Sequence, residues 1–82
     1  SVVANVMIGI GNKPYLRGEG PGLNWDEGVP VNFIEIGKWA WSPPRKNASL
    51  TVQLYRNDND PDKSGKIQIK AGEKIEITPD FS

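Results

Sequence analysis

Short runs of alternating apolar and polar residues, separated by glycine and proline, constrain the fold of this chain more than any other feature. A period of two places alternate side chains on opposite faces of a β-strand. No run shows the 3.6-residue period of an amphipathic helix. The sequence therefore predicts an all-β fold, an antiparallel β-sandwich of about seven short strands. The expected strands are residues 2–10, 15–17, 29–36, 38–42, 50–56, 66–70 and 74–78.

Residues 50–56 give the clearest strand pattern, because Leu50, Val52 and Leu54 alternate with polar or aromatic residues. We expect these three aliphatic side chains to face the core, and Tyr55 to lie on the outer face.

Two further local features follow from the pattern. In residues 29–36 the alternation changes parity between Phe33 and Ile34, which predicts a β-bulge. The runs at 66–70 and 74–78 are joined by three residues, which predicts a β-hairpin.

Chain length and charge limit the classes of function. Residues 1–82 are expected to form one β-sandwich domain, either alone or as a piece of a larger protein. Ten Lys and Arg balance ten Asp and Glu, so no pull toward nucleic acid or anionic lipid is expected. No apolar run is long enough for a membrane span. The absence of Cys suits any compartment, so localisation stays open.

The chain lacks the side chains that most enzymes use. It has no Cys and no His, which removes thiolate nucleophiles, imidazole acid–base chemistry and Cys/His zinc sites. A Ser–Lys pair is possible by composition, but no motif favours one. The acids Asp26 and Glu27 beside Trp25 are expected to cap or solvate a loop. We therefore predict no enzyme, no catalytic residue and no cofactor.

Two loops have features of ligand-binding loops. Residues 18–22 are rich in glycine, but they lack the Gly-Lys-Ser/Thr signature of a phosphate loop and precede no helix. Residues 57–65 carry acids at alternate positions from Asp58, but Lys63 and Ile69 stand where a calcium loop needs glycine and glutamate. We expect an ordinary solvated turn and no metal site, with a weak calcium site as the alternative.

The aromatic residues are the strongest candidates for a binding site. Trp39 and Trp41 lie two residues apart and therefore share one strand face, while Trp25 lies in a glycine-rich loop. These rings either pack in the core or stack against a ligand such as a sugar, whose hydroxyl groups neighbouring polar side chains would bind. The candidate ligand-binding residues are Trp25, Trp39, Trp41, Tyr55, Asn24 and Asp26.

The order of several short motifs over about fifty residues is similar to one known family. A glycine-containing strand end comes first, then a Leu-polar-Trp-acid motif, a small apolar strand start, a second Trp, and an apolar-Tyr-basic strand end before an Asp-rich loop. In this chain the motifs are residues 7–11, 23–26 and 28–31, Trp39, and residues 54–56 followed by 57–65. They resemble the starch-binding carbohydrate modules and their glycogen-binding relatives.

The resemblance implies an immunoglobulin-like sandwich that binds an α-glucan. Trp25 would correspond to one Trp of the main sugar platform, and Trp39 to an aromatic residue of a second, groove-like site. The family has another platform Trp just after the polar loop. This chain departs from that pattern, because Lys66 stands there and no aromatic residue is near it.

Two functional hypotheses follow. A non-catalytic carbohydrate-binding module, with a polysaccharide ligand, predicts that Trp25 or the Trp39–Trp41 pair is exposed. A structural or protein-interaction module of a larger protein, with no sugar ligand, predicts that all three Trp are buried and that free strand edges face a protein partner.

Overall fold

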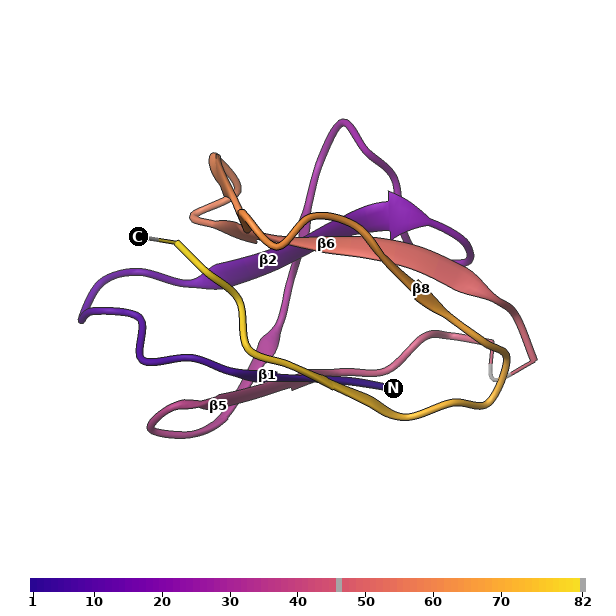
Figure 1. The fold of residues 1–82 in the computed structure, drawn as a ribbon, viewed down its shortest axis with the longest axis horizontal. Coiled ribbons are helices and arrows are strands. Elements are labelled where there is room, and N and C mark those ends of the chain that lie inside the picture. The colour runs from indigo at the N-terminus through magenta and orange to yellow at the C-terminus, as the bar shows by residue number, and fades with distance from the viewer. Residues whose placement is uncertain (46, 82) are drawn as a thin grey trace.

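The computed structural model describes residues 1–45 and 47–81, which fold into two facing β-sheets (Figure 1). The β1–β5 sheet has the strand order β4-β5-β1-β9, and the β2–β6 sheet has the order β3-β2-β6-β7, with β8 also paired to β6. This part of the chain contains no helix, and therefore none long and apolar enough to cross a membrane. The predicted all-β class is thus confirmed, in a two-layered, sandwich-like arrangement. The strands are β1 Val2–Asn5, β2 Pro14–Glu19, β3 Val29–Pro30, β4 Asn32–Glu35, β5 Lys38–Trp41, β6 Leu50–Arg56, β7 Asp60–Pro61, β8 Ile67–Ile69 and β9 Ile75–Ile77.

The β2–β6 sheet buries one face and exposes the other, as the alternation in β6 predicts. Leu50, Val52 and Leu54 are buried, and Leu16 of β2 is buried directly opposite Leu54. Tyr55 has the opposite parity and lies on the outer face, as expected.

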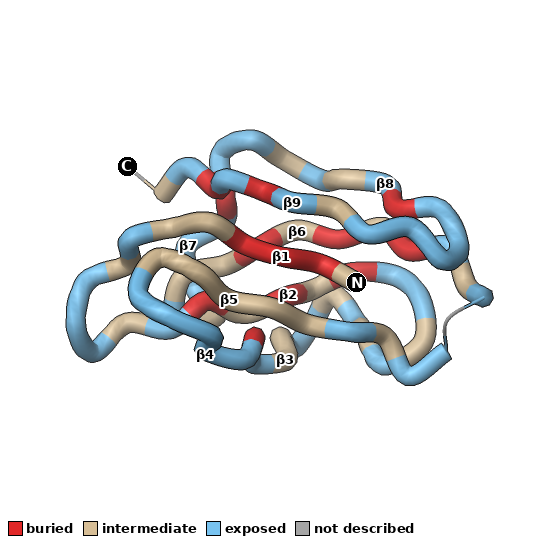
Figure 2. Tube along the Cα trace, turned by 90° about the horizontal axis from the view of Figure 1, so that it is seen from below, coloured by how far each residue is buried: buried red, intermediate tan, exposed pale blue. Residues whose placement is uncertain are grey.

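The inner face of the β1–β5 sheet is built around β1, the most buried strand in Figure 2. Residues directly opposite one another in a ladder share a face. Val2 and Ala4, both fully buried, therefore direct their neighbours on β5 and β9 toward the core. The two rows across the sheet are Trp41, Val2 and Ile75, and Trp39, Ala4 and Ile77.

The single strand expected at residues 29–36 is two strands that belong to different sheets. β3 pairs with β2, whereas β4 pairs with β5, and buried Val31 lies at the crossing. Pro30 has no backbone N–H to extend the first ladder, and the Val31 N–H donates to the Pro14 carbonyl oxygen at 3.2 Å. The bulge is confirmed, since the pairing of β4 with β5 shifts register between Phe33 and Glu35.

The expected hairpin at residues 66–78 is wrong. β8 pairs with β6 in one sheet, and β9 runs parallel to β1 in the other. Each segment carries isoleucines that become buried. Because the two strands lie in different sheets, Ile69 packs into the core from the β2–β6 sheet and Ile77 from the β1–β5 sheet. The intervening turn, closed by the Glu73 N–H to Lys70 oxygen bond, carries the chain between the sheets.

The strand expected at residues 2–10 ends early, because β1 stops at Asn5. The chain then turns through Gly9 and Gly11, and Gly11 has a φ of 89°, which favours glycine. Ile10, the last residue of the expected strand, is therefore outside the sheet and fully exposed.

Candidate functional site

Trp25 lies on a loop that covers the outer face of the β2–β6 sheet. After β2 the chain rises above this sheet and then descends to the β1–β5 sheet (Figure 1). The Trp25 side chain is half-buried, and it is not among the partly buried residues that pack against the hydrophobic core. Trp25 is therefore a surface ring that the loop holds against polar neighbours.

Two charged side chains contact the Trp25 ring. The indole N–H donates to Glu19 Oε1 at 3.2 Å, which fixes the edge of the ring. Lys66, just before β8, places its Nζ 4.7 Å from the ring centroid, a cation–π contact. Lys66 is itself exposed, so this contact covers the ring with a side chain that is otherwise in solvent.

Arg17 of β2 anchors the loop from beneath. Its Nη1 donates to the Trp25 carbonyl oxygen at 3.1 Å, while its Nε and Nη2 donate to Asp58 Oδ1 at 2.8 Å and to the Asp58 carbonyl oxygen at 2.7 Å. The guanidinium also lies 4.4 Å from the centroid of the Tyr55 ring. Arg17 therefore connects the loop to the turn after β6 and to the sheet.

The Arg17–Asp58 pair shifts both ionisations. The hydrogen bond from Arg17 holds the pKa of the Asp58 carboxyl below its usual value of 3.8, against the effect of desolvation and with help from the Gly28 N–H. The same bond raises the pKa of Arg17. Both groups are therefore held in their charged forms.

Asp58 occupies a turn shaped for this contact. Asn57 and Asp58 have φ values of 54° and 59°, in the left-handed region that Asn and Asp tolerate best after glycine. Both carboxylate oxygens accept from the Gly28 N–H at 3.1 Å. A Cβ at Gly28 would collide with Asp58 Oδ1, so the close approach requires glycine there.

The loop also has its own hydrogen bonds. Asn24 Oδ1 accepts from the N–H groups of Asp26 and Glu27 at 3.0 and 2.6 Å, and the Asn24 carbonyl oxygen accepts from Gly18 at 3.1 Å. The two bonds accepted by the Asn24 side chain are typical of an Asx turn. Asn24 therefore shapes the loop, and Asp26 is exposed beside Trp25.

The predicted site residues fall into two groups. Asn24, Trp25, Asp26 and Tyr55 lie on or over the outer face of the β2–β6 sheet. Trp39 and Trp41 are half-buried and pack against the core from the other sheet, and Trp39 meets Phe33 edge-on, with centroids 5.2 Å apart. Spacing alone showed that the two Trp share a face, but not which face.

Arg17, Glu19 and Lys66 were not predicted from the sequence as contacts of Trp25. Arg17 and Glu19 lie two residues apart on the outer face of β2, opposite to the face of buried Leu16. The alternation in β2 could therefore have placed them on that surface. The position of Lys66 beside Trp25 was indicated only by the family resemblance.

The acids of residues 57–65 have separate partners. Asp58 binds Arg17, Asp60 pairs with Arg56 Nη2 at 3.0 Å, and buried Asp62 accepts from backbone N–H groups. No group of three His, Cys, Asp or Glu side chains suited to a metal occurs among the residues described. The arrangement thus gives no support to the calcium alternative.

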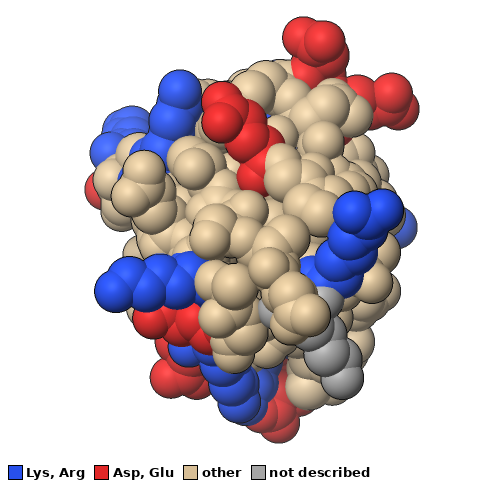
Figure 3. All heavy atoms as spheres, turned by 90° about the vertical axis from the view of Figure 1, so that its right-hand side faces the viewer, with Lys and Arg blue, Asp and Glu red and all other residues tan. Residues whose placement is uncertain are grey.

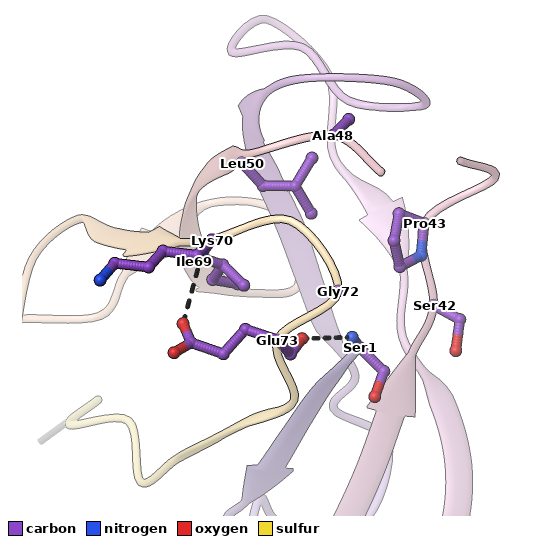
Figure 4. Close-up of a pocket in the computed structure, with 9 residues that line it drawn as sticks. All are labelled: Ser1, Ser42, Pro43, Ala48, Leu50, Ile69, Lys70, Gly72 and Glu73. Atoms are coloured by element: carbon purple, nitrogen blue, oxygen red, sulfur yellow. Dashed lines mark hydrogen bonds between the residues drawn. The ribbon is translucent and has the colours of Figure 1, made fainter. Parts of the chain in front are cut away.

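A cavity of about 280 Å³ lies at the end of the sandwich where the chain begins. This end has uncharged atoms in the middle and charged side chains toward the rim (Figure 3). The Ser1 amine and the Lys70 N–H donate to the backbone oxygen and Oε1 of Glu73 at 2.9 and 3.3 Å (Figure 4). The hydroxyls of Ser1 and Ser42 point away from the Lys70 amine, so this lining offers no Ser–Lys pair.

An exposed apolar surface, which was not predicted from the sequence, lies at the opposite end of the sandwich. Its members, here called the end patch, are Met7, Ile10, Phe33 and Ile36, which line one groove, and Ile34, the chain neighbour of Phe33. The available signal was the loss of alternation after Phe33, which leaves apolar residues on both sides of the strand.

Comparison of the chain with protein-family models, with curated proteins and with solved structures finds no match.

Proposed function

We propose that this chain is a non-catalytic carbohydrate-binding module of immunoglobulin-like, starch-binding-like architecture, with Trp25 as its stacking ring. One observation carries the proposal. The resemblance expects position 66 to share a sugar platform with Trp25, and Lys66 Nζ lies 4.7 Å from the centroid of that ring. Two positions far apart in sequence are thus neighbours on one surface, as the family pattern requires.

The surroundings of Trp25 suit a sugar. An indole outside the core offers an apolar face to the C–H groups of a pyranose ring, and polar neighbours can bind the hydroxyls. Glu19, Asp26 and Gln68 are exposed, and Gln68 belongs to the same sheet through β8. These side chains form the polar rim of the proposed site.

Lys66 is a weak obstacle to stacking. A cation–π contact at an exposed site contributes about 0.5–1 kcal/mol. A sugar that stacks on Trp25 can displace the ammonium at that cost and gain a hydrogen-bond donor. The absence of the second Trp leaves half of the platform, so we expect affinity for α-glucans weaker than two rings would give.

The test is a titration of the chain with β-cyclodextrin and maltoheptaose, followed by Trp fluorescence and calorimetry. Binding should be lost in Trp25→Ala while the circular dichroism spectrum is retained. Lys66→Trp should restore the platform and tighten binding about tenfold or more, since one stacked aromatic contributes on the order of 1.5 kcal/mol. Lys74→Trp, which adds the same ring before β9, is the matched control and should have no effect.

Failure of both wild type and Lys66→Trp to bind either glucan would overturn the proposal for α-glucans. Binding that survives Trp25→Ala would overturn the assignment of the site.

A second candidate function, protein interaction, is favoured by a different observation. β4 is an edge strand whose four residues are all exposed (Figure 2), and it carries Phe33 and Ile34 of the end patch. Unpaired edges beside exposed apolar side chains are typical of protein-binding surfaces.

A further inference from the structure

We infer that the end patch and the free edge of β4 form a self-association surface, and that its occupant is the same surface of a second copy of this chain. The exposed fractions are 76% for Met7, 107% for Ile10, 60% for Phe33, 54% for Ile34 and 80% for Ile36. Four of these residues surround one groove, and exposed apolar patches of this kind are typical of interaction surfaces.

The patch is hollowed rather than flat. The loop after β1 and the β4–β5 turn enclose a groove of about 410 Å³, which Met7, Ile10, Phe33 and Ile36 line together with Trp39. Phe33 contacts Trp39 edge-on, so the groove floor is supported by a ring that packs on the core. The groove is therefore built on the folded sheet.

The area matches what a dimer needs. With about 200 Å² as an upper value for each fully exposed large side chain, the four patch residues that line the groove expose at most roughly 650 Å². The largest patch on a typical monomer is about 300–600 Å², and a stable interface buries about 800 Å² on each partner. The end patch is thus close to one half of a standard interface.

The charge pattern favours a second copy over a charged partner. The residues that line the groove carry no charge, and the chain has a net charge of zero. Two copies can therefore approach without repulsion, and the groove has no charge to select an acidic or basic partner.

The β4 edge allows a symmetric contact. β4 is the end strand of its sheet, so β4 of a second copy, related by a two-fold axis, can lie antiparallel beside it. Such a pairing would extend the β1–β5 sheet through both copies.

This inference is independent of the sugar site, because Trp25 lies on the outer face of the other sheet. The test is sedimentation equilibrium of the full chain from about 1 µM to about 1 mM, a range that covers micromolar and weaker self-association. We expect a mass that rises from 9.0 kDa toward twice that value. Ile10→Lys and Ile36→Lys change exposed residues, and each appears twice in the dimer, so each should weaken association at least tenfold.

Ala71→Lys is the control, since it adds the same charge to an exposed position in the turn between β8 and β9, at the opposite end of the sandwich, and should leave the dimer unchanged. Circular dichroism of each variant verifies folding. A wild type that stays monomeric over the whole range would overturn the inference and leave the patch to another occupant, such as a neighbouring domain. A dimer that Ile10→Lys and Ile36→Lys leave intact would also overturn it.

Discussion

Arg17 and Asp58, far apart in the chain, form the contact on which the Trp25 loop depends. The ion pair at 2.8 Å is supplemented by a bond from Arg17 to the Asp58 backbone, and Arg17 also binds the Trp25 carbonyl oxygen. Asp58 in turn accepts from the Gly28 N–H, at the last residue of the loop before β3. One pair thus holds the second half of the loop to the β6–β7 turn.

The stability that Asp58 supplies should depend on pH. Because its pKa is lower in the folded chain than the usual 3.8, its contribution is full above that value and is lost as pH falls through the lower, folded value. Asp58→Asn should therefore lower the free energy of unfolding at pH 7. The difference from wild type should shrink below pH 3.8. Urea denaturation across this range measures it.

Asp60→Asn is the comparison for Asp58→Asn, because its pair with Arg56 is exposed and such pairs contribute little. A difference between wild type and Asp58→Asn that is the same at pH 7 and at the acid end would contradict the role given to the Asp58 charge.

Gly28→Ala should destabilise the chain by about 1–3 kcal/mol, since an added Cβ would collide with the Asp58 carboxylate and crowd Tyr15. The matched control is Gly9→Ala, whose Cβ would meet only the Asn12 side-chain amide at 3.3 Å. Thermal unfolding of the two variants compares them. An unchanged midpoint for Gly28→Ala would show that the loop and the turn separate readily.

Alternation alone predicted the strands that stay in one sheet. β6 has the expected bounds because its inward and outward residues alternate without interruption. Alternation did not reveal that the chain changes sheets at Val31, or that β8 and β9 lie in different sheets. A buried isoleucine has the same pattern whichever layer it joins, so the choice depends on long-range packing that local sequence does not encode.

The candidate site was predictable in part for a similar reason. The glycine-rich loop indicated that Trp25 is displayed, whereas Trp39 and Trp41 carry no local mark of facing inward. That assignment comes from their pairing with Val2 and Ala4, which are distant in sequence. The contact of Arg17 with Asp58 likewise depends on how β2 and β6 pair.

The acceptor oxygen of the Asp62 side chain should contribute to the stability of the fold. It is 2% exposed, and its Oδ1 accepts from the N–H groups of Ser64 and Asp80 at 2.9 and 2.8 Å. Asp62→Ala leaves both donors without this partner and should cost about 1–3 kcal/mol. Asp62→Asn keeps an acceptor oxygen and should cost less. Urea denaturation of both variants tests this, and equal losses would show that the acceptor is unimportant.

Trp41 and Trp25 should respond oppositely to truncation. Trp41 packs against the core and lies opposite fully buried Val2, so Trp41→Ala should cost about 3 kcal/mol or more. In a domain this small that is a large share of the total stability.

Trp25 lies outside the core, and Trp25→Ala removes one indole hydrogen bond and one exposed cation–π contact, which together contribute about 1 kcal/mol to the free energy of unfolding. Urea midpoints measured by circular dichroism, which does not depend on the fluorophore removed, separate the two. Equal losses would mean that Trp25 is a structural residue and would remove the physical basis for treating it as a platform.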